Sequence, residues 1–129
     1  MPWQVVYFRY RDGSEPVSDA IDGMPPWVQA AIDNQIERLA VFGPHLGFPY
    51  TSQIDGGLRE LRCHFGPDLY RILYRRSRNL FVLLGFLPKH SPRVPEADIE
   101  LARQRWDEFV RRMAERPRRP PRAAGHDAP

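Results

Sequence analysis

Three consecutive runs of alternating apolar and charged residues in the middle of the chain restrict its fold most strongly. These runs cover residues 58–65, 69–76 and 80–87, and turn-forming segments at 66–68 and 77–79 separate them. Alternation with a period of two is typical of β-strands that bury one face. Loops as short as these join antiparallel neighbours. The sequence therefore predicts a meander of three antiparallel strands.

Positive charge is concentrated on this meander. Residues 57–95 contain eight Lys or Arg and two acidic residues, which gives a net charge of +6. Residues 1–56 carry a net charge of −4, and residues 96–129 are near neutral at +1. A basic sheet on an otherwise acidic or neutral body favours a polyanionic partner such as nucleic acid. A solvated, arginine-rich strand surface explains the same charges, so charge alone leaves both interpretations open.

The segments around the meander predict one more strand and three helices. Residues 3–9 are rich in β-forming residues, whereas apolar residues recur at helical spacing over 16–24 and 26–42. Residues 45–56 show no clear period and are predicted to form a loop. Acidic residues in the first turn and an apolar stripe predict a final helix over residues 96–116.

The resulting order β-α-α-β-β-β-α predicts the α+β class for a domain covering residues 1–116. We expect a small, twisted, mainly antiparallel sheet with two helices on one face. The final helix is expected at the sheet edge or across its lower end. Residues 117–129 are rich in Pro and Arg and have little to bury, so they are predicted to form a disordered tail.

Composition narrows the class of protein further. The chain has a single cysteine, Cys63, which excludes an internal disulfide framework and fits a reducing compartment. Its four histidines are scattered and show no metal-ligand spacing, so neither a metal nor another cofactor is expected. The apolar run near the N-terminus is too short for a signal peptide or a membrane span. We therefore expect a cytoplasmic protein without a membrane partner.

Side chains two residues apart on a strand lie on the same face of a sheet. Glu60 and Arg62 therefore share one face of their strand, and Arg71 shares a face with Arg75 on the next. The opposite, aromatic side is expected to pack under the helices, which would leave the arginine side open. For Glu60, a structural ion pair with Arg62 or Arg71 is favoured over a catalytic role.

The last strand of the meander is followed by Lys89 and His90, which we expect at the rim of this open face. Clustered guanidinium and ammonium groups bind phosphate and stabilise the charge that builds up on a phosphorane. RNA cleavage by the substrate's own 2′-hydroxyl needs neither a metal nor a serine, although a base and an acid help. For His90, a catalytic acid and an ordinary surface histidine are equally open. The residues alone predict no more than a basic α+β domain.

Several short motifs, in a fixed order between residues 17 and 109, narrow the prediction. They are Gly-Leu-Arg-Glu-Leu-Arg at 57–62, Tyr-Arg-Ile-Leu-Tyr at 70–74, Leu-Leu-Gly-Phe at 83–86 and Ile-Glu-Leu-Ala at 99–102. Lys89, Arg93 and Pro95 lie between the last two. In these motifs and their spacing the chain resembles the phage-derived Gp49-like, HigB-type branch of the RelE/ParE toxin superfamily.

The resemblance implies a RelE-like fold and the toxin of a type II toxin–antitoxin system. Such a toxin is a metal-independent mRNA endoribonuclease that acts on ribosome-bound mRNA and inhibits translation. Its partner would be a cognate antitoxin, usually of the helix-turn-helix type. By motif position Arg71 would stabilise the phosphorane, and Lys89 would bind phosphate or transfer a proton. The candidate residues are catalytic Arg62, Arg71, Lys89 and His90, and RNA-binding Arg59, Arg75 and Arg93.

The chain departs from the usual residues of these toxins at Leu84, Pro88 and Val94. Two alternatives on the same fold therefore stay open. One is a non-catalytic module that binds antitoxin or nucleic acid, and the other is a ParE-like inhibitor of gyrase. The basic cluster around Lys89 favours the nuclease over the gyrase inhibitor, which would not need it.

Overall fold

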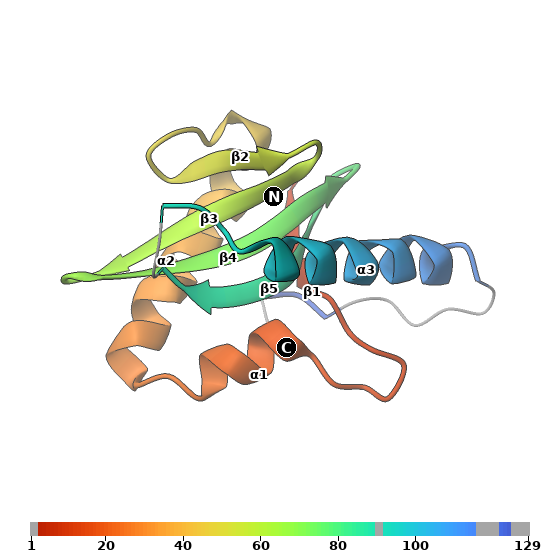
Figure 1. The fold of residues 1–129 in the computed structure, drawn as a ribbon, viewed down its shortest axis with the longest axis horizontal. Coiled ribbons are helices and arrows are strands. Elements are labelled where there is room, and N and C mark those ends of the chain that lie inside the picture. Colours follow the sequence, from red (N-terminus) through yellow and green to blue (C-terminus); the bar gives the residue numbers. More distant parts are fainter. Residues whose placement is uncertain (1–2, 90–91, 116–121, 125–129) are drawn as a thin grey trace.

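The computed structural model describes residues 3–89, 92–115 and 122–124. Its strands are β1 (Gln4–Tyr7), β2 (Thr51–Asp55), β3 (Leu58–Phe65), β4 (Asp68–Ser77) and β5 (Leu80–Pro88). Its helices are α1 (Pro16–Asp22), α2 (Pro26–Phe42), the short 3-10 helix η1 (Gly43–His45) and α3 (Glu96–Met113). The predicted α+β class is confirmed, with one strand more than predicted (Figure 1). None of the described helices has the length and apolar content needed to cross a membrane.

The strands form one sheet in the order β1-β5-β4-β3-β2. All neighbours are antiparallel except β1 and β5, which run parallel. The predicted meander is confirmed as β3, β4 and β5. The turn between β3 and β4 uses Gly66, whose φ of 58° suits the first central position of a two-residue hairpin loop. This turn brings the end of β3 next to the start of β4.

Strand β2 lies where the sequence analysis predicted a loop, so that prediction was wrong for these residues. The strand pairs with β3 at the edge of the sheet, and its register shifts between Gln53 and Asp55. At its start, the hydroxyl groups of Thr51 and Tyr74 form a buried hydrogen bond of 2.6 Å. An edge strand has one neighbour and little apolar surface, so it leaves only a weak pattern in the sequence.

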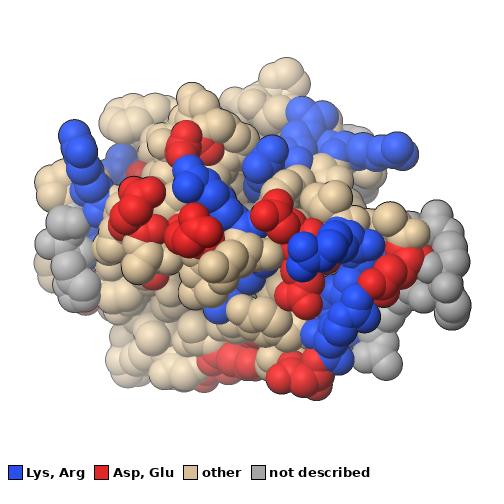
Figure 2. All heavy atoms as spheres, turned by 45° about the vertical axis from the view of Figure 1, so that its right-hand side comes forward, with Lys and Arg blue, Asp and Glu red and all other residues tan. Residues whose placement is uncertain are grey.

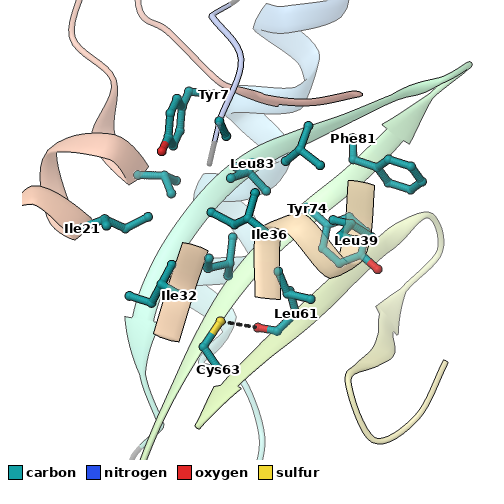
Figure 3. Packing of buried hydrophobic residues seen from close by; sticks show 14 of the residues in the cluster. Tyr7, Ile21, Ile32, Ile36, Leu39, Leu61, Cys63, Tyr74, Phe81 and Leu83 are labelled. Carbon is teal, nitrogen blue, oxygen red and sulfur yellow. Dashed lines mark hydrogen bonds between the residues drawn. The ribbon is translucent and has the colours of Figure 1, made fainter. Parts of the chain in front are cut away.

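Helices cover both faces of the sheet, and each face has its own hydrophobic cluster. Helices α1 and α2 pack on one face, as predicted, and Figure 3 shows part of this cluster, including Ile36, Leu61 and Leu83. Helix α3 does not lie at an edge but crosses the opposite face, where Ile99 and Phe109 pack with Leu73 and other strand residues. In Figure 1 α3 lies in front of the sheet and α2 behind it. Helix α3 packs mainly against β4 and β5, so it covers only part of this face of the sheet.

A short segment near the C-terminus lies along the outer edge of β1. The Tyr7 N–H donates to the Arg122 carbonyl at 3.0 Å, and the Ala124 N–H donates to the Val5 carbonyl at 2.8 Å. The Arg122 guanidinium is paired with Glu15, which raises the pKa of the arginine, and Ala124 is buried. These residues belong to the predicted disordered tail, but the unpaired edge of β1 and the Glu15 carboxylate hold them in place. The rest of that tail lies outside the described residues.

Replacing Ala124 with Asp should release this segment, because the substitution places a carboxylate among buried apolar side chains. We expect the free energy of unfolding to fall by about 1–3 kcal/mol and the Tyr7 amide to exchange with solvent faster. Urea unfolding and hydrogen exchange measure these two effects. The half-buried neighbour Ala123 supplies the matched control, Ala123→Asp, which should cost less. Unchanged exchange at Tyr7 in the Ala124 variant would contradict the docking of this segment.

Candidate functional site

A pocket of about 400 Å³ opens at the end of the sheet where β3 ends, β4 begins and β5 ends. The antiparallel register produces it, because His64 pairs with Leu69 and Tyr70 pairs with Pro88. Three successive strands therefore contribute side chains to the same hollow. The lining residues are Arg62, His64, Pro67, Asp68, Leu69, Tyr70, Pro88 and Lys89.

Two cationic residues of the pocket are anchored through their backbones. The Arg62 N–H donates to the Tyr50 carbonyl at 2.8 Å, and the Lys89 N–H donates to the Leu69 carbonyl at 2.8 Å. Both side chains are half-buried, whereas the nearby His64 is exposed. The stems of such side chains pack along the protein while their charged ends reach water. The pocket thus has two cationic residues on its wall, and a hydrogen bond holds the backbone of each in place.

Arg71 lies beside Arg62 in the register but is buried, with only 2% of its surface exposed. Its Nε lies 2.8 Å from Oε2 of Glu60, and its Nη2 donates to the Pro92 carbonyl at 2.8 Å. The other Glu60 oxygen accepts a hydrogen bond of 2.8 Å from the Ser52 hydroxyl. The predicted ion pair of Glu60 is therefore present. The predicted open face is wrong at Arg71, because the loop before α3 covers it.

The other predicted site residues do not line the pocket. Arg59 lies on the α2 face by strand alternation, and Arg75 contacts the ring of Trp106 at 4.8 Å. Arg75 is four residues beyond Arg71, which is about 13 Å along a strand. Arg93 is exposed in the loop before α3. His90 lies outside the described residues.

The basic residues of the meander are therefore not gathered on one face. One group surrounds the pocket, and another, with Arg75, Arg76 and Arg78, lies near the turn between β4 and β5 at the opposite end of the sheet. Figure 2, in which the right-hand side of Figure 1 comes forward, shows Lys and Arg side chains interspersed with Asp and Glu on that face. The net charge of +6 in the sequence does not become a single positive surface.

Three pocket residues with polar side chains, His64, Asp68 and Tyr70, were not identified as candidates from the sequence. Strand alternation already places His64 on the same face as Arg62, so His64 could have been added to the candidate residues on that ground. Asp68 follows the turn between β3 and β4, and Tyr70 stacks against Phe86 with ring centres 5.6 Å apart. Asp68 had no distinguishing sequence signal, and Tyr70 was noted only as the first residue of the motif at 70–74.

Cys63 is not part of the site. The side chain is buried in the cluster on the α2 face, and this burial raises the pKa of its thiol to about 12. The thiolate needed for nucleophilic attack is therefore strongly disfavoured at neutral pH. In the described part of the chain, no three His, Cys, Asp or Glu side chains come together in a group that could hold a metal ion.

The arrangement is suited to binding a phosphate group and exchanging protons next to it. The guanidinium of Arg62 can bind two phosphate oxygens, and the ammonium of Lys89 adds a second positive charge. His64 and Asp68 also line this pocket, and their side chains carry an imidazole and a carboxylate. These groups can act as a general acid and a general base.

The chain also matches a known protein family. The family described as "Phage derived protein Gp49-like (DUF891)" matches residues 19–107, a range that contains the whole pocket. This family is part of the RelE/ParE-like toxin superfamily. The match supports the toxin of a toxin–antitoxin system, with a cognate antitoxin as partner. A comparison with curated proteins found no match.

The buried ion pair can be tested by a double-mutant cycle with Glu60→Leu and Arg71→Met. Each single substitution leaves one buried charge uncompensated and should lower the free energy of unfolding by about 3–5 kcal/mol. The double variant should lose clearly less than the sum of the two. Urea unfolding followed by circular dichroism gives all three values, and additive losses would contradict the pairing.

Proposed function

The chain belongs to the phage-derived Gp49-like family, and on this premise we propose that it is a toxin that cleaves mRNA. The proposed activity is a metal-independent endoribonuclease acting on ribosome-bound mRNA and thereby inhibiting translation. The attacking group would be the 2′-hydroxyl of the substrate itself. The observation that carries the proposal is the pocket with Arg62, His64 and Lys89 on its wall.

Arg62 and Lys89 bind the scissile phosphate in this mechanism. Attack by the 2′-hydroxyl places additional negative charge on the phosphate oxygens in the transition state. Positive groups held in fixed positions stabilise this charge more than they stabilise the ground state. The backbone anchoring of both residues supports this role, since their positions do not depend on the substrate.

Proton transfer requires a base for the 2′-hydroxyl and an acid for the leaving 5′-oxygen. His64 is the proposed partner for one of these transfers, because an imidazole can exchange a proton near neutral pH. Asp68 lies in the same pocket, and its carboxylate would take the proton of the 2′-hydroxyl where His64 gives a proton to the leaving 5′-oxygen. His90 follows Lys89 directly and stays a candidate for the acid.

Arg71 acts in this proposal as a positioning residue rather than through direct contact with RNA. Its guanidinium joins β4 to Glu60 on β3 and to the loop before α3. It thereby holds β4 against β3, the strand that carries Arg62. It also contacts Pro92, which lies three residues after Lys89. Of the predicted RNA-binding residues, Arg93 lies in this loop, and it is proposed to contact the sugar-phosphate backbone of the RNA. Arg59 and Arg75 face elsewhere and receive no role.

A cognate antitoxin of the helix-turn-helix type is the proposed protein partner. Such an antitoxin would silence the toxin by blocking access of mRNA to the pocket. The basic residues of the pocket would favour an acidic, amphipathic segment. We expect this complex to contain the toxin in an inactive form.

Inducible expression of wild type, Lys89→Ala and Arg62→Ala tests the nuclease directly. Wild type should stop growth and produce new mRNA 5′ ends inside codons. Each pocket substitution should reduce cleavage by about 10²-fold, because it removes a group that stabilises the transition state. The matched control is Arg111→Ala, which removes an exposed arginine on α3 far from the pocket and should behave as wild type.

The outcomes of this experiment separate the alternatives. Growth arrest without new 5′ ends would favour a gyrase inhibitor, which a plasmid supercoiling assay with purified gyrase would then detect. Folded wild-type protein that causes neither arrest nor cleavage would leave a non-catalytic binding module. Equal cleavage by wild type and the Lys89 variant would remove this pocket as the active site.

A further inference from the structure

Two aromatic side chains are exposed beside the pocket, in the segment between η1 and β2. Phe48 is 78% exposed and Tyr50 is 39% exposed. A single exposed apolar side chain is ordinary in a folded protein. Two aromatic rings next to a cationic pocket are a different arrangement, because aromatic and cationic groups together bind single-stranded nucleic acids.

Arginine side chains connect both rings to the rest of the protein. The guanidinium carbon of Arg62 lies 5.7 Å from the centre of the Phe48 ring. The guanidinium carbon of Arg38, on α2, lies 4.1 Å from the centre of the Tyr50 ring. Arg62 also lines the pocket, so the residue proposed to bind phosphate is the one that contacts Phe48.

The backbone of this segment is held in place on both sides of the rings. Leu46 is buried in the α2-side cluster, and the Tyr50 N–H donates to the Gly47 carbonyl at 3.0 Å. Immediately after Tyr50, the side chain of Thr51 is buried and bonded to Tyr74. The rings therefore project from an anchored segment. Because this segment is already ordered, less conformational entropy of the protein is lost when a ligand stacks on the rings.

We propose that Phe48 and Tyr50 form a stacking shelf for an unpaired base next to the phosphate held at Arg62. The inference rests on the proposed RNA-cleaving function and adds the position of a base to it. Stacking on an aromatic ring is available to any unpaired base, so the shelf contributes affinity with little sequence preference. Bases within a duplex are already stacked, and the shelf therefore selects single-stranded RNA.

The charges beside the rings favour RNA over an apolar protein segment as the occupant. Each ring has a guanidinium group near it, and Lys89 adds another positive charge in the neighbouring pocket. The negative phosphates on either side of a base would complement these charges. A purely apolar partner would leave them without compensation.

Fluorescence anisotropy with a short, labelled single-stranded oligonucleotide tests the shelf. Its sugars are 2′-deoxy at every position, so that binding is measured without cleavage. The second probe is the same strand with abasic residues, which retains the phosphates and lacks bases to stack. Wild-type protein should bind the normal strand about tenfold more tightly than the abasic strand.

Phe48→Ala should remove most of this preference and leave the affinity for the abasic strand unchanged. Tyr50→Ala should reduce the preference by a smaller factor, because its ring is less exposed. Trp27→Ala is the matched control. Trp27 is 60% exposed but lies at the N-terminal end of α2, whereas Phe48 and Tyr50 follow the C-terminal end of this helix. This control should retain the full preference of wild type.

The two levels of the proposal fail in different ways. Equal binding of both strands by wild type, or an unchanged preference in Phe48→Ala, overturns the shelf and leaves the phosphate site standing. Wild-type protein that binds neither strand overturns the RNA site together with the shelf. A Phe48→Ala variant that loses only antitoxin binding would identify a protein-docking surface, which also overturns the shelf.

Discussion

The ion pair between Glu60 and Arg71 is the interaction on which the arrangement of this site depends. A charge buried between β3 and β4 must be paired, and Arg71 meets this requirement through Glu60 and the Pro92 carbonyl. The hydrogen bond from Arg71 to the Pro92 carbonyl holds the loop before α3 over this part of the sheet. It also removes Arg71 from the positive charges that a ligand can reach. Arg62 and Lys89, just beyond this covered region, remain as the cations of the pocket.

Much of the fold follows from local patterns, and the errors arise where these patterns carry no information. Period-two alternation correctly predicts the meander, and helical spacing predicts α1, α2 and α3. Strand alternation shows which residues share a face, but not which face a distant helix covers. Leu58 and Leu73 share the face of Arg71, and these apolar residues were the available signal that α3 packs there. Edge strand β2 is short and polar, so its existence depends on β3 rather than on its own sequence.

The site was only partly predictable for the same reason. Arg62 and Lys89 could be placed together from strand alternation, the meander and the motif set. His64 could have been included by its position two residues after Arg62. The exposure of Phe48 and Tyr50 could not have been predicted, because loop residues have no period and their neighbours are set by tertiary contacts. The Gp49-like family match supports a toxin, whereas the chemistry proposed for the pocket comes from its own residues.

The central claim is that this pocket cleaves RNA by using the 2′-hydroxyl next to the scissile phosphate. The most direct measurement compares purified protein acting on a ribosome-bound oligoribonucleotide and on the same ribosome-bound strand with one 2′-deoxy sugar at the cleaved position. We expect the substitution to abolish cleavage at that bond and to leave cleavage elsewhere unchanged, with products ending in a 2′,3′-cyclic phosphate and a 5′-hydroxyl. Continued cleavage at the 2′-deoxy position would show a different nucleophile and contradict the account.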